Sequence, residues 1–324
     1  MLNSAETIDS INSLVKKEIP FLFIISFDGN SNVVFPLDKL HSKNIFFKTP
    51  SANNLKNDNF NFQLEFFNKE PMPFSDYSAI FQKVKGEIGK GNTFLLNLTA
   101  STPIESNLNL YGLFSIAQAK YKLFYNNEFA LFSPECFIKI EESRIKTFPM
   151  KGTIRADIPD ARERLLNDGK ETAEHATIVD LLRNDLSRVA TNVHLNRYKY
   201  LDLIETNSGA IYQMSSEIEG ELPSDFKNRL GEILFSLLPA GSVTGAPKDK
   251  TVEIIREVEM QPRGYYTGVF GVWDNEKLDS AVMIRFIRND AGKLRYHSGG
   301  GITFQSDCKL EYNEMIEKIY VPIC

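Results

Sequence analysis

The chain has 324 residues and a mass of 36.8 kDa; 42% of its residues are hydrophobic, 24% charged and 11% aromatic. This composition is typical of a globular protein and excludes the disordered, collagen-like and coiled-coil classes. The 37 basic and 42 acidic residues leave a formal charge of −5, which argues against nucleic acid as the main partner. Three isolated cysteines, and four histidines without ligand spacing, predict neither a disulfide framework nor a zinc site.

The first predicted element is a buried strand over residues 19–27, an apolar run near the N-terminus. This run is far shorter than the roughly 20 residues that a membrane-spanning helix needs. No basic stretch leads into an apolar one at the N-terminus, so no signal peptide is predicted. We therefore expect a cytoplasmic protein without a membrane partner.

The elements that follow alternate between strand pairs and single helices. A helix is predicted over about 75–90, where apolar residues recur at helical spacing and Gly91 ends the pattern. Turn signals predict hairpins at Asn126-Asn127, at Ser143-Arg144 and at 290–292. Further helical patterns lie at about 160–189, 225–238, 247–259 and 308–319. Without a regular βαβ repeat or a flexible linker, this order predicts one α+β domain with antiparallel sheets.

Two predicted helices each carry a pair of glutamates three residues apart, Glu171 with Glu174 and Glu311 with Glu314. This spacing places each pair on one helix face, beside an apolar stripe. A single such pair is usually a solvated face. Two pairs that lean inward would repel unless a cation or a proton joins them. Four oxygen ligands without His or Cys suit a hard ion such as Mg2+.

Two glycine-rich segments, 241–248 and 298–303, are candidates for anion binding. The first lacks the offsets of a phosphate loop, but its small residues lead into a helix N-terminus that offers backbone N–H groups to a carboxylate. The second offers a run of amides. The alternative for each is a tight turn that requires positive φ. Arg285, inside an apolar strand, is a candidate carboxylate clamp.

The predicted turn at Ser143-Arg144 also makes a prediction about chemistry. In that register Cys136 lies opposite Lys151, and Glu135 lies within roughly 5–8 Å of the lysine. The alternative interpretation is an ordinary cross-strand ion pair.

Together these segments resemble the chorismate-utilising enzymes, most closely their aminodeoxychorismate synthase component I branch. The matching stretches occur in family order between about Ser75 and Lys318: SPECFI, PMKGT, KETAEHATIVDLLRNDLSRV, PAGSVTGAPK, RGYYTGVFG, MIRF, GGGIT and EYNEMIEK. The resemblance implies an α+β fold of two packed, largely antiparallel sheets that enclose the active site, with helices outside. It also implies a single chorismate-binding domain over 1–324, with a short divergent part at 1–74 and a catalytic core at 75–320.

The resemblance implies a role for each candidate residue. The four glutamates match an Mg2+ site, with Glu174 and Glu314 favoured as direct ligands over Glu171 and Glu311. Glu135 matches the general acid that protonates the departing C4 hydroxyl. The positions that match substrate contacts are Thr153, Thr244, Tyr266, Arg285, Gly300, Gly301 and Lys318.

Lys151 distinguishes two branches of the family. The resemblance implies that anthranilate synthases carry Ala at this position and aminodeoxychorismate synthases carry Lys. In the latter the amine adds at C2 of chorismate and expels the C4 hydroxyl, and ammonia then enters at C4 and displaces the lysine. The attack requires a neutral amine, which is a minor form of an unperturbed lysine at pH 7. We expect burial and a nearby Mg2+ to lower the pKa of this amine.

Two positions depart from the family pattern. Leu95 stands where relatives that add water to chorismate place a basic lysine, and a leucine cannot activate water. Gln213 stands where the family often has a histidine, and its consequence is left open.

These observations predict an Mg2+-dependent enzyme that converts chorismate to 4-amino-4-deoxychorismate, toward 4-aminobenzoate and folate. No cysteine lies in a nucleophile-elbow context, so the ammonia is expected from a separate glutamine amidotransferase subunit. The alternatives are anthranilate synthase component I and, from a different class, a chorismate-binding subunit that has lost catalysis. Lys151 favours amination over the former, and the two glutamate pairs argue against the latter.

Overall fold

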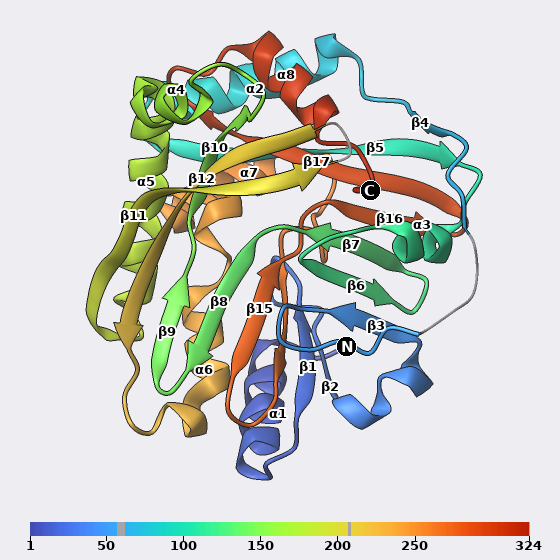
Figure 1. The fold of residues 1–324 in the computed structure, drawn as a ribbon, viewed down its shortest axis with the longest axis vertical. Helices are drawn as coiled ribbons and strands as arrows, with labels where there is room; N and C mark the ends of the chain where they lie inside the picture. Colours follow the sequence, from blue (N-terminus) through green and yellow to red (C-terminus); the bar gives the residue numbers. More distant parts are fainter. Residues whose placement is uncertain (57–61, 207–208, 324) are drawn as a thin grey trace.

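The computed structural model describes residues 1–56, 62–206 and 209–323, and two antiparallel sheets form its framework (Figure 1). The strands of the first sheet are β1 (Phe21–Ile25), β2 (Val33–Pro36), β8 (Cys136–Glu141), β9 (Arg144–Thr147), β10 (Met150–Arg155), β11 (Thr191–Thr206), β12 (Gly209–Glu221), β14 (Val269–Trp273) and β15 (Leu278–Val282). Their order is β10-β12-β9-β8-β15-β14-β1-β2, with β11 paired to β12.

The second sheet is built from the other strands of the described chain. They are β3 (Ile45–Lys48), β4 (Phe67–Lys69), β5 (Leu95–Ser106), β6 (Tyr121–Tyr125), β7 (Phe129–Ser133), β13 (Gly245–Ala246), β16 (Phe286–Asp290) and β17 (Lys293–Thr303). Their order is β13-β5-β17-β16-β7-β6-β3, with β4 paired to β5. In Figure 1 this sheet crosses the right half of the molecule, and the first sheet runs down its lower left.

Helices cover the outer faces of both sheets. They are α1 (Ser4–Lys16), α2 (Phe74–Gly89), α3 (Leu110–Ile116), α4 (Ala161–Asn167), α5 (Gly169–Leu186), α6 (Leu230–Leu237), α7 (Lys248–Val258) and α8 (Cys308–Glu317), with short 3-10 turns at Leu37–Lys39, His41–Lys43, Phe226–Arg229 and Gly241–Val243. Apolar residues of α1, α5 and α6 pack on the first sheet. Those of α2, α7 and α8 pack on β5 and β17 of the second. None of the described helices has the length and apolar character needed to cross a membrane.

The two sheets face each other across an apolar core. Leu22 and Phe270 from the first sheet meet Leu123, Leu131 and Phe286 from the second, and each is almost fully buried. Alternation along each strand sends the next residues to the outer faces, where the helices cover them. The predicted α+β class with two largely antiparallel sheets is therefore confirmed.

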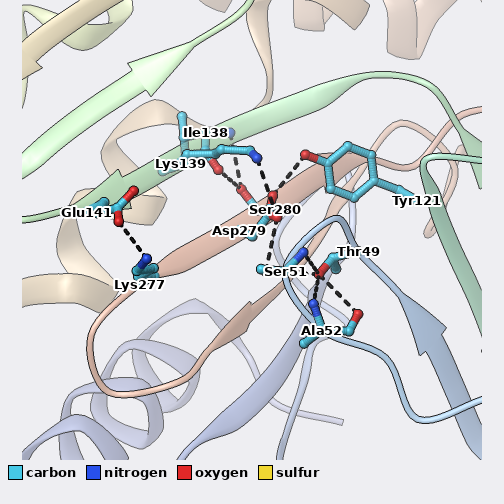
Figure 2. Close-up of polar contacts among 10 residues, drawn as sticks. All are labelled: Thr49, Ser51, Ala52, Tyr121, Ile138, Lys139, Glu141, Lys277, Asp279 and Ser280. Atoms are coloured by element: carbon cyan, nitrogen blue, oxygen red, sulfur yellow. Dashed lines mark hydrogen bonds and ion pairs between the residues drawn. The ribbon is translucent and has the colours of Figure 1, made fainter.

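A buried polar network also joins the sheets (Figure 2). Asp279 on β15 is 3% exposed, and its carboxylate accepts a 2.8 Å hydrogen bond from the Tyr121 hydroxyl on β6 of the second sheet. Ser51 donates to the same carboxylate at 3.1 Å, and the Lys139 ammonium lies 3.6 Å away. A buried carboxylate is costly unless it is paired, so this network constrains how the sheets dock.

The predicted local elements are largely confirmed, with two corrections. The helical pattern at 160–189 is two helices, because Asp168 has extended backbone angles, ends α4 and caps α5 by accepting a hydrogen bond from the Glu171 N–H. The turn between β8 and β9 uses Glu142 and Ser143, both at positive φ, one residue before the predicted Ser143-Arg144.

Candidate active site

Lys151 lies where β10 bulges away from β12, in a register shift between Met150 and Thr153. Gly152 has a φ of +86°, and a Cβ there would stand 2.9 Å from Oε2 of Glu171. The bulge therefore brings the β10 backbone close against α5, as only a glycine permits. Lys151 Nζ reaches Oε2 of Glu174 at 2.8 Å.

The carboxylates around Lys151 decide its protonation. Burial disfavours the ammonium form, but the charges of Glu174, Glu314 and Glu171 and the hydrogen bond to Glu174 outweigh it, so the pKa of Lys151 is raised. The pairing with a carboxylate thus raises this pKa, whereas the expected lowering depends on a nearby Mg2+ and stays a prediction.

The second glutamate pair lies on α8, over the second sheet. Lys318 follows this helix; its Nζ contacts Oε1 of Glu314 at 2.6 Å and donates to the Gly299 carbonyl at 3.0 Å. A Cβ added to Gly300 would stand 3.4 Å from Oε2 of Glu311, 3.7 Å from Nζ of Lys318 and 3.9 Å from Oε1 of Glu314. Gly300 thus lies close to two carboxylates and an ammonium, with space for one further carbon between them.

Arg285 stands at the junction of β15 and β16, with a positive φ of 52°. Its guanidinium carbon lies 5.3 Å from the ring centre of Tyr320, and its Nε has no partner among the described residues. Tyr266 is 3% exposed, and burial raises the pKa of its hydroxyl despite the charges of Arg263 and Arg285. A cation and a buried hydroxyl thus face the same region.

Glu135 lies between β7 and β8, where its backbone N–H donates to the Ser133 hydroxyl at 3.1 Å. Its Oε1 accepts a hydrogen bond from the hydroxyl of Ser242. Burial raises the pKa of Glu135, although the bond from Ser242 and the charges of Arg285 and Lys318 oppose the rise. A carboxyl with a raised pKa is suited to act as an acid near neutral pH.

The charges that act on the pKa of each group indicate that these groups lie near one another. Glu135 is coupled to Arg285 and Lys318, and Lys318 is coupled to Glu314, Arg285 and Lys151. Burial and the two neighbouring cations lower the pKa of Lys318 despite Glu314. The structure thus brings residues from β10, α5, α8 and the β7–β8 and β15–β16 junctions into one site.

Two residues predicted to contact the substrate, Thr244 and Thr153, lie apart from this group of charged side chains. The Thr244 hydroxyl is fully buried and donates to the Ala240 carbonyl at 2.8 Å, inside its own loop. Thr153 is exposed on β10 and lines an open cavity of about 470 Å3, which Glu171 also borders. This volume lies in the range of ligand pockets, so the cavity is a candidate entrance.

The predicted cross-strand contact between Glu135 and Lys151 is wrong. β8 and β9 pair only from Lys139 with Lys146 to Glu141 with Arg144, and Lys151 lies beyond them on β10, which pairs with β12 instead. The Glu135 carboxylate contacts Ser242, and the charges that act on its pKa are those of Arg285 and Lys318.

The four glutamates provide the oxygen donors that Mg2+ prefers. Burial and the negative charge of Glu174 raise the pKa of Glu171, although Lys151 opposes this rise. Burial and the negative charge of Glu314 likewise raise the pKa of Glu311. In the described part of the chain, no three of these carboxylates meet at a common coordination point. Lys151 and Lys318 hold Glu174 and Glu314, so a cation would have to replace those two ion pairs. The donor chemistry fits a hard cation, which would have to draw the two glutamate pairs together.

Sequence reasoning missed three residues of the site. Ser242 binds Glu135, Tyr320 packs under Arg285, and Lys170 lies 3.8 Å from Glu174. Ser242 lies two residues before the candidate Thr244, and Tyr320 lies two residues after Lys318. The only signal in the sequence was therefore that these residues lie close to predicted site residues.

Known proteins share this sequence pattern. A sequence model of the chorismate binding enzyme family matches residues 38–323. A Haemophilus influenzae protein named "Uncharacterized PabA-like protein" is 47% identical over 316 residues, which cover 98% of this chain and 96% of that protein. Aminodeoxychorismate synthase component 1 of Salmonella typhimurium is 31% identical over 257 residues, 75% of this chain and 56% of that protein. Anthranilate synthase component 1 of Aeropyrum pernix is 36% identical over 197 residues, 58% of this chain and 43% of that protein.

The fold is shared as well. The solved structure of the menaquinone-specific isochorismate synthase from Escherichia coli superposes with a TM-score of 0.76, covering 98% of this chain and 81% of that one. The two sequences are 15% identical, so this similarity shows a shared fold and nothing more.

Proposed function

The chain belongs to the family of chorismate-binding enzymes, and we propose that it aminates chorismate at C4 to give 4-amino-4-deoxychorismate. The observation that carries this proposal is Lys151, a partly buried amine on the β10 bulge, near the carboxylates of α5 and α8. A buried lysine in a polar site is a recurrent nucleophile.

In this proposal Lys151 Nζ forms a bond to C2 of chorismate and loses a proton, both conjugated ring double bonds shift, and the C4–oxygen bond breaks. Glu135 supplies the proton that lets the hydroxyl leave as water. Ammonia then bonds to C4, both ring double bonds shift back and the C2–nitrogen bond breaks, and the proton that ammonia loses returns to the Lys151 amine. The sum is chorismate plus ammonia to aminodeoxychorismate plus water.

Arg285, Lys318, Tyr266 and the amides of Gly300 and Gly301 are proposed to hold the two substrate carboxylates. Arg285 and Lys318 supply two positive charges on one side of the site, which supports this role. Thr153 and Thr244 are proposed to shape the site from the open cavity and from the buried loop.

We propose that Mg2+ binds between α5 and α8, with Glu174 and Glu314 as direct ligands and Glu171 and Glu311 beside them. When bound, the ion would neutralise carboxylate charge next to the substrate. Displaced from Glu174, Lys151 would lose the interaction that raises its pKa, and burial would then favour the neutral amine.

The ammonia is proposed to come from a separate glutamine amidotransferase subunit. Cys136 is buried and its thiol pKa is raised to about 12, mainly by burial, so it is poorly suited to glutamine hydrolysis. The name of the Salmonella relative, component 1, agrees with a two-subunit enzyme. The product would serve 4-aminobenzoate and folate synthesis in the cytoplasm.

Anthranilate synthase component I is the second candidate, because a relative of that name is 36% identical over part of the chain. Lys151 is the feature that favours amination without loss of pyruvate.

The test is a product assay with purified protein, chorismate, Mg2+ and excess ammonium salt at mildly alkaline pH, with products identified by mass. We expect aminodeoxychorismate from the wild type, its loss on adding EDTA, and at least a 100-fold slower reaction for Lys151→Ala. Lys277→Ala, which removes a half-exposed lysine between β14 and β15, is the matched control and should behave as wild type.

Intact-protein mass spectrometry tests the nucleophile directly. Without ammonia, the wild type should gain the mass of chorismate less one water, and Lys151→Ala should not. Anthranilate as the wild-type product would overturn the proposal, and chorismate binding without any turnover would indicate a non-catalytic subunit.

A further inference from the structure

Two buried donors in the site have no hydrogen-bond partner within the described ranges: the Ser298 hydroxyl and the Nε–H of Arg285. Ser298 is 3% exposed. Buried polar groups in native proteins are nearly always paired, so each exception calls for an explanation. A ligand that accepts from both groups is one such explanation.

The strand register places these two donors side by side. The last pair of the β16–β17 ladder is Phe286 with His297. One step further, the antiparallel register sets Arg285 opposite Ser298. The positive φ of Arg285 ends the ladder at this point and turns its side chain out of the regular pattern. Arg285 and Ser298 are thus the two residues that adjoin the last pair of this ladder.

Ser298 also lies on the face of β17 that carries the site. Residues two apart share a face, so Ser298 stands between Tyr296 and Gly300. A Cβ added to Gly300 would stand 3.7 Å from Lys318 Nζ, and Tyr296 lies near enough to Arg285 to raise the pKa of its guanidinium. The two neighbours of Ser298 on this strand face therefore lie near the two cations proposed to hold substrate carboxylates.

We propose that the Ser298 hydroxyl and the Arg285 Nε–H together bind one carboxylate of the substrate. This inference rests on the proposed function and extends it by assigning a further substrate-binding residue. An ionised carboxylate is acceptor-only and can take several donors on its two oxygens. Binding would satisfy both unpaired donors at once, with charge-assisted hydrogen bonds.

The first test is the dissociation constant of chorismate for Ser298→Ala, measured by isothermal titration without ammonia. A hydrogen bond to a charged group is worth a factor of roughly 10 or more in affinity, so the dissociation constant should rise by at least about tenfold. The melting temperature without ligand should not fall, because the variant deletes a buried hydroxyl that has no partner. A purely structural role would lower the melting temperature instead.

Thr102→Val is the matched control. Thr102 is 1% exposed, its hydroxyl also lacks a partner, and it lies on neighbouring β5 opposite Tyr296 instead of beside the cations. This variant should bind chorismate as the wild type does. Wild-type affinity in Ser298→Ala, or an equal loss in Thr102→Val, would overturn the inference.

A double-mutant cycle with Arg285→Lys tests whether the two donors share one carboxylate. The losses should not add, because either change alone breaks the shared arrangement. Additive losses would contradict the pairing. Binding needs no turnover, so the product assay decides the proposed function separately, and a wild type that does not bind chorismate overturns both.

Discussion

At the scale of single residues, the site is held by two lysine–glutamate pairs that neutralise each other. Lys151 forms an ion pair with Glu174, and Lys318 forms one with Glu314. In the proposed complex a substrate carboxylate would take Lys318 from Glu314, and Mg2+ would take Glu174 from Lys151. The two glutamates would then pair with the ion and Lys318 with the substrate, so that no charge of the site is left without a partner, which would be the costly outcome.

Glu135 is set apart from these pairs because a neutral hydroxyl, that of Ser242, contacts its carboxylate. This bond favours the ionised form and lowers the pKa of Glu135, against the larger effect of burial. Arg285 and Lys318 act in the same direction as Ser242. If the protonated carboxyl is the active form, activity is lost as pH rises through its pKa.

Ser242→Ala should therefore move the alkaline limb of the kcat/KM profile to higher pH, because it removes one of the interactions that lower the pKa of Glu135. Glu135→Gln should lose at least about 100-fold in rate and the limb itself. The measurement is a pH–rate profile, with Ser242→Thr as the control that keeps a hydroxyl and the wild-type limb. An alkaline limb that stays or moves to lower pH in Ser242→Ala would contradict the assignment.

At the scale of elements, the bulge in β10 sets the position of Lys151 beside Glu174. The Nε2–H of Gln213 on β12 donates to the Gly152 carbonyl at 3.0 Å, and Gln213 pairs with Thr153 in the ladder. The side chain therefore holds a backbone group that leaves the regular ladder. This contact gives a physical role to a residue that departs from the family pattern.

Gln213→Met keeps the length of the side chain and removes its donor. We expect kcat to fall by roughly tenfold or more with little change in KM, because a shift of about 1 Å in a reacting group can cost as much as 100-fold. Gln213→His retains an N–H donor and should keep most of the activity. The rate of the Lys151 adduct, followed by intact mass, is the direct readout. An unchanged rate in Gln213→Met would show that the bulge holds without this contact.

The hairpins could be predicted from the sequence, and the position of Lys151 could not. Asn126 and Asn127 mark the β6–β7 turn because both tolerate positive φ. Glu142 and Ser143 adopt positive φ without such a signal, so the turn was placed one residue late. Beyond it, β10 leaves β9 for a partner some 60 residues away in sequence. Local spacing carries no information about that pairing.

At the scale of the whole molecule, hairpin spacing sufficed to predict two antiparallel sheets but not their strand order. β12 lies between β10 and β9, and β1 beside β14, through contacts between distant segments. The Asp279–Tyr121 network between the sheets could not be predicted from the sequence either, because it depends on how the sheets dock. Candidate site residues could be named because the motifs carry them, whereas their partners, such as Ser242, depend on loop geometry.

The apolar core between the two sheets borders a histidine that should make the free energy of unfolding depend on pH. His297 on β17 is 5% exposed and packs against the rings of Tyr266 and Phe286. Burial, with Arg288 and Arg295 nearby, lowers its pKa to about 3, although Asp290 opposes this. The folded pKa lies below that of the unfolded chain, near 6.5, so the stabilisation is present above pH 6.5 and is lost as pH falls toward 3.

Between pH 7 and pH 5 this histidine should reduce the free energy of unfolding by about 2 kcal/mol. Buried carboxyls with raised pKa, such as Glu135 and Asp185, contribute with the opposite sign, so the test compares variants instead of a single curve. Denaturant unfolding at both pH values should show that His297→Gln loses about 2 kcal/mol less than the wild type. His194→Gln, at an exposed position, should keep the wild-type difference. Equal losses in wild type and His297→Gln would mean that His297 does not stay neutral in the folded core.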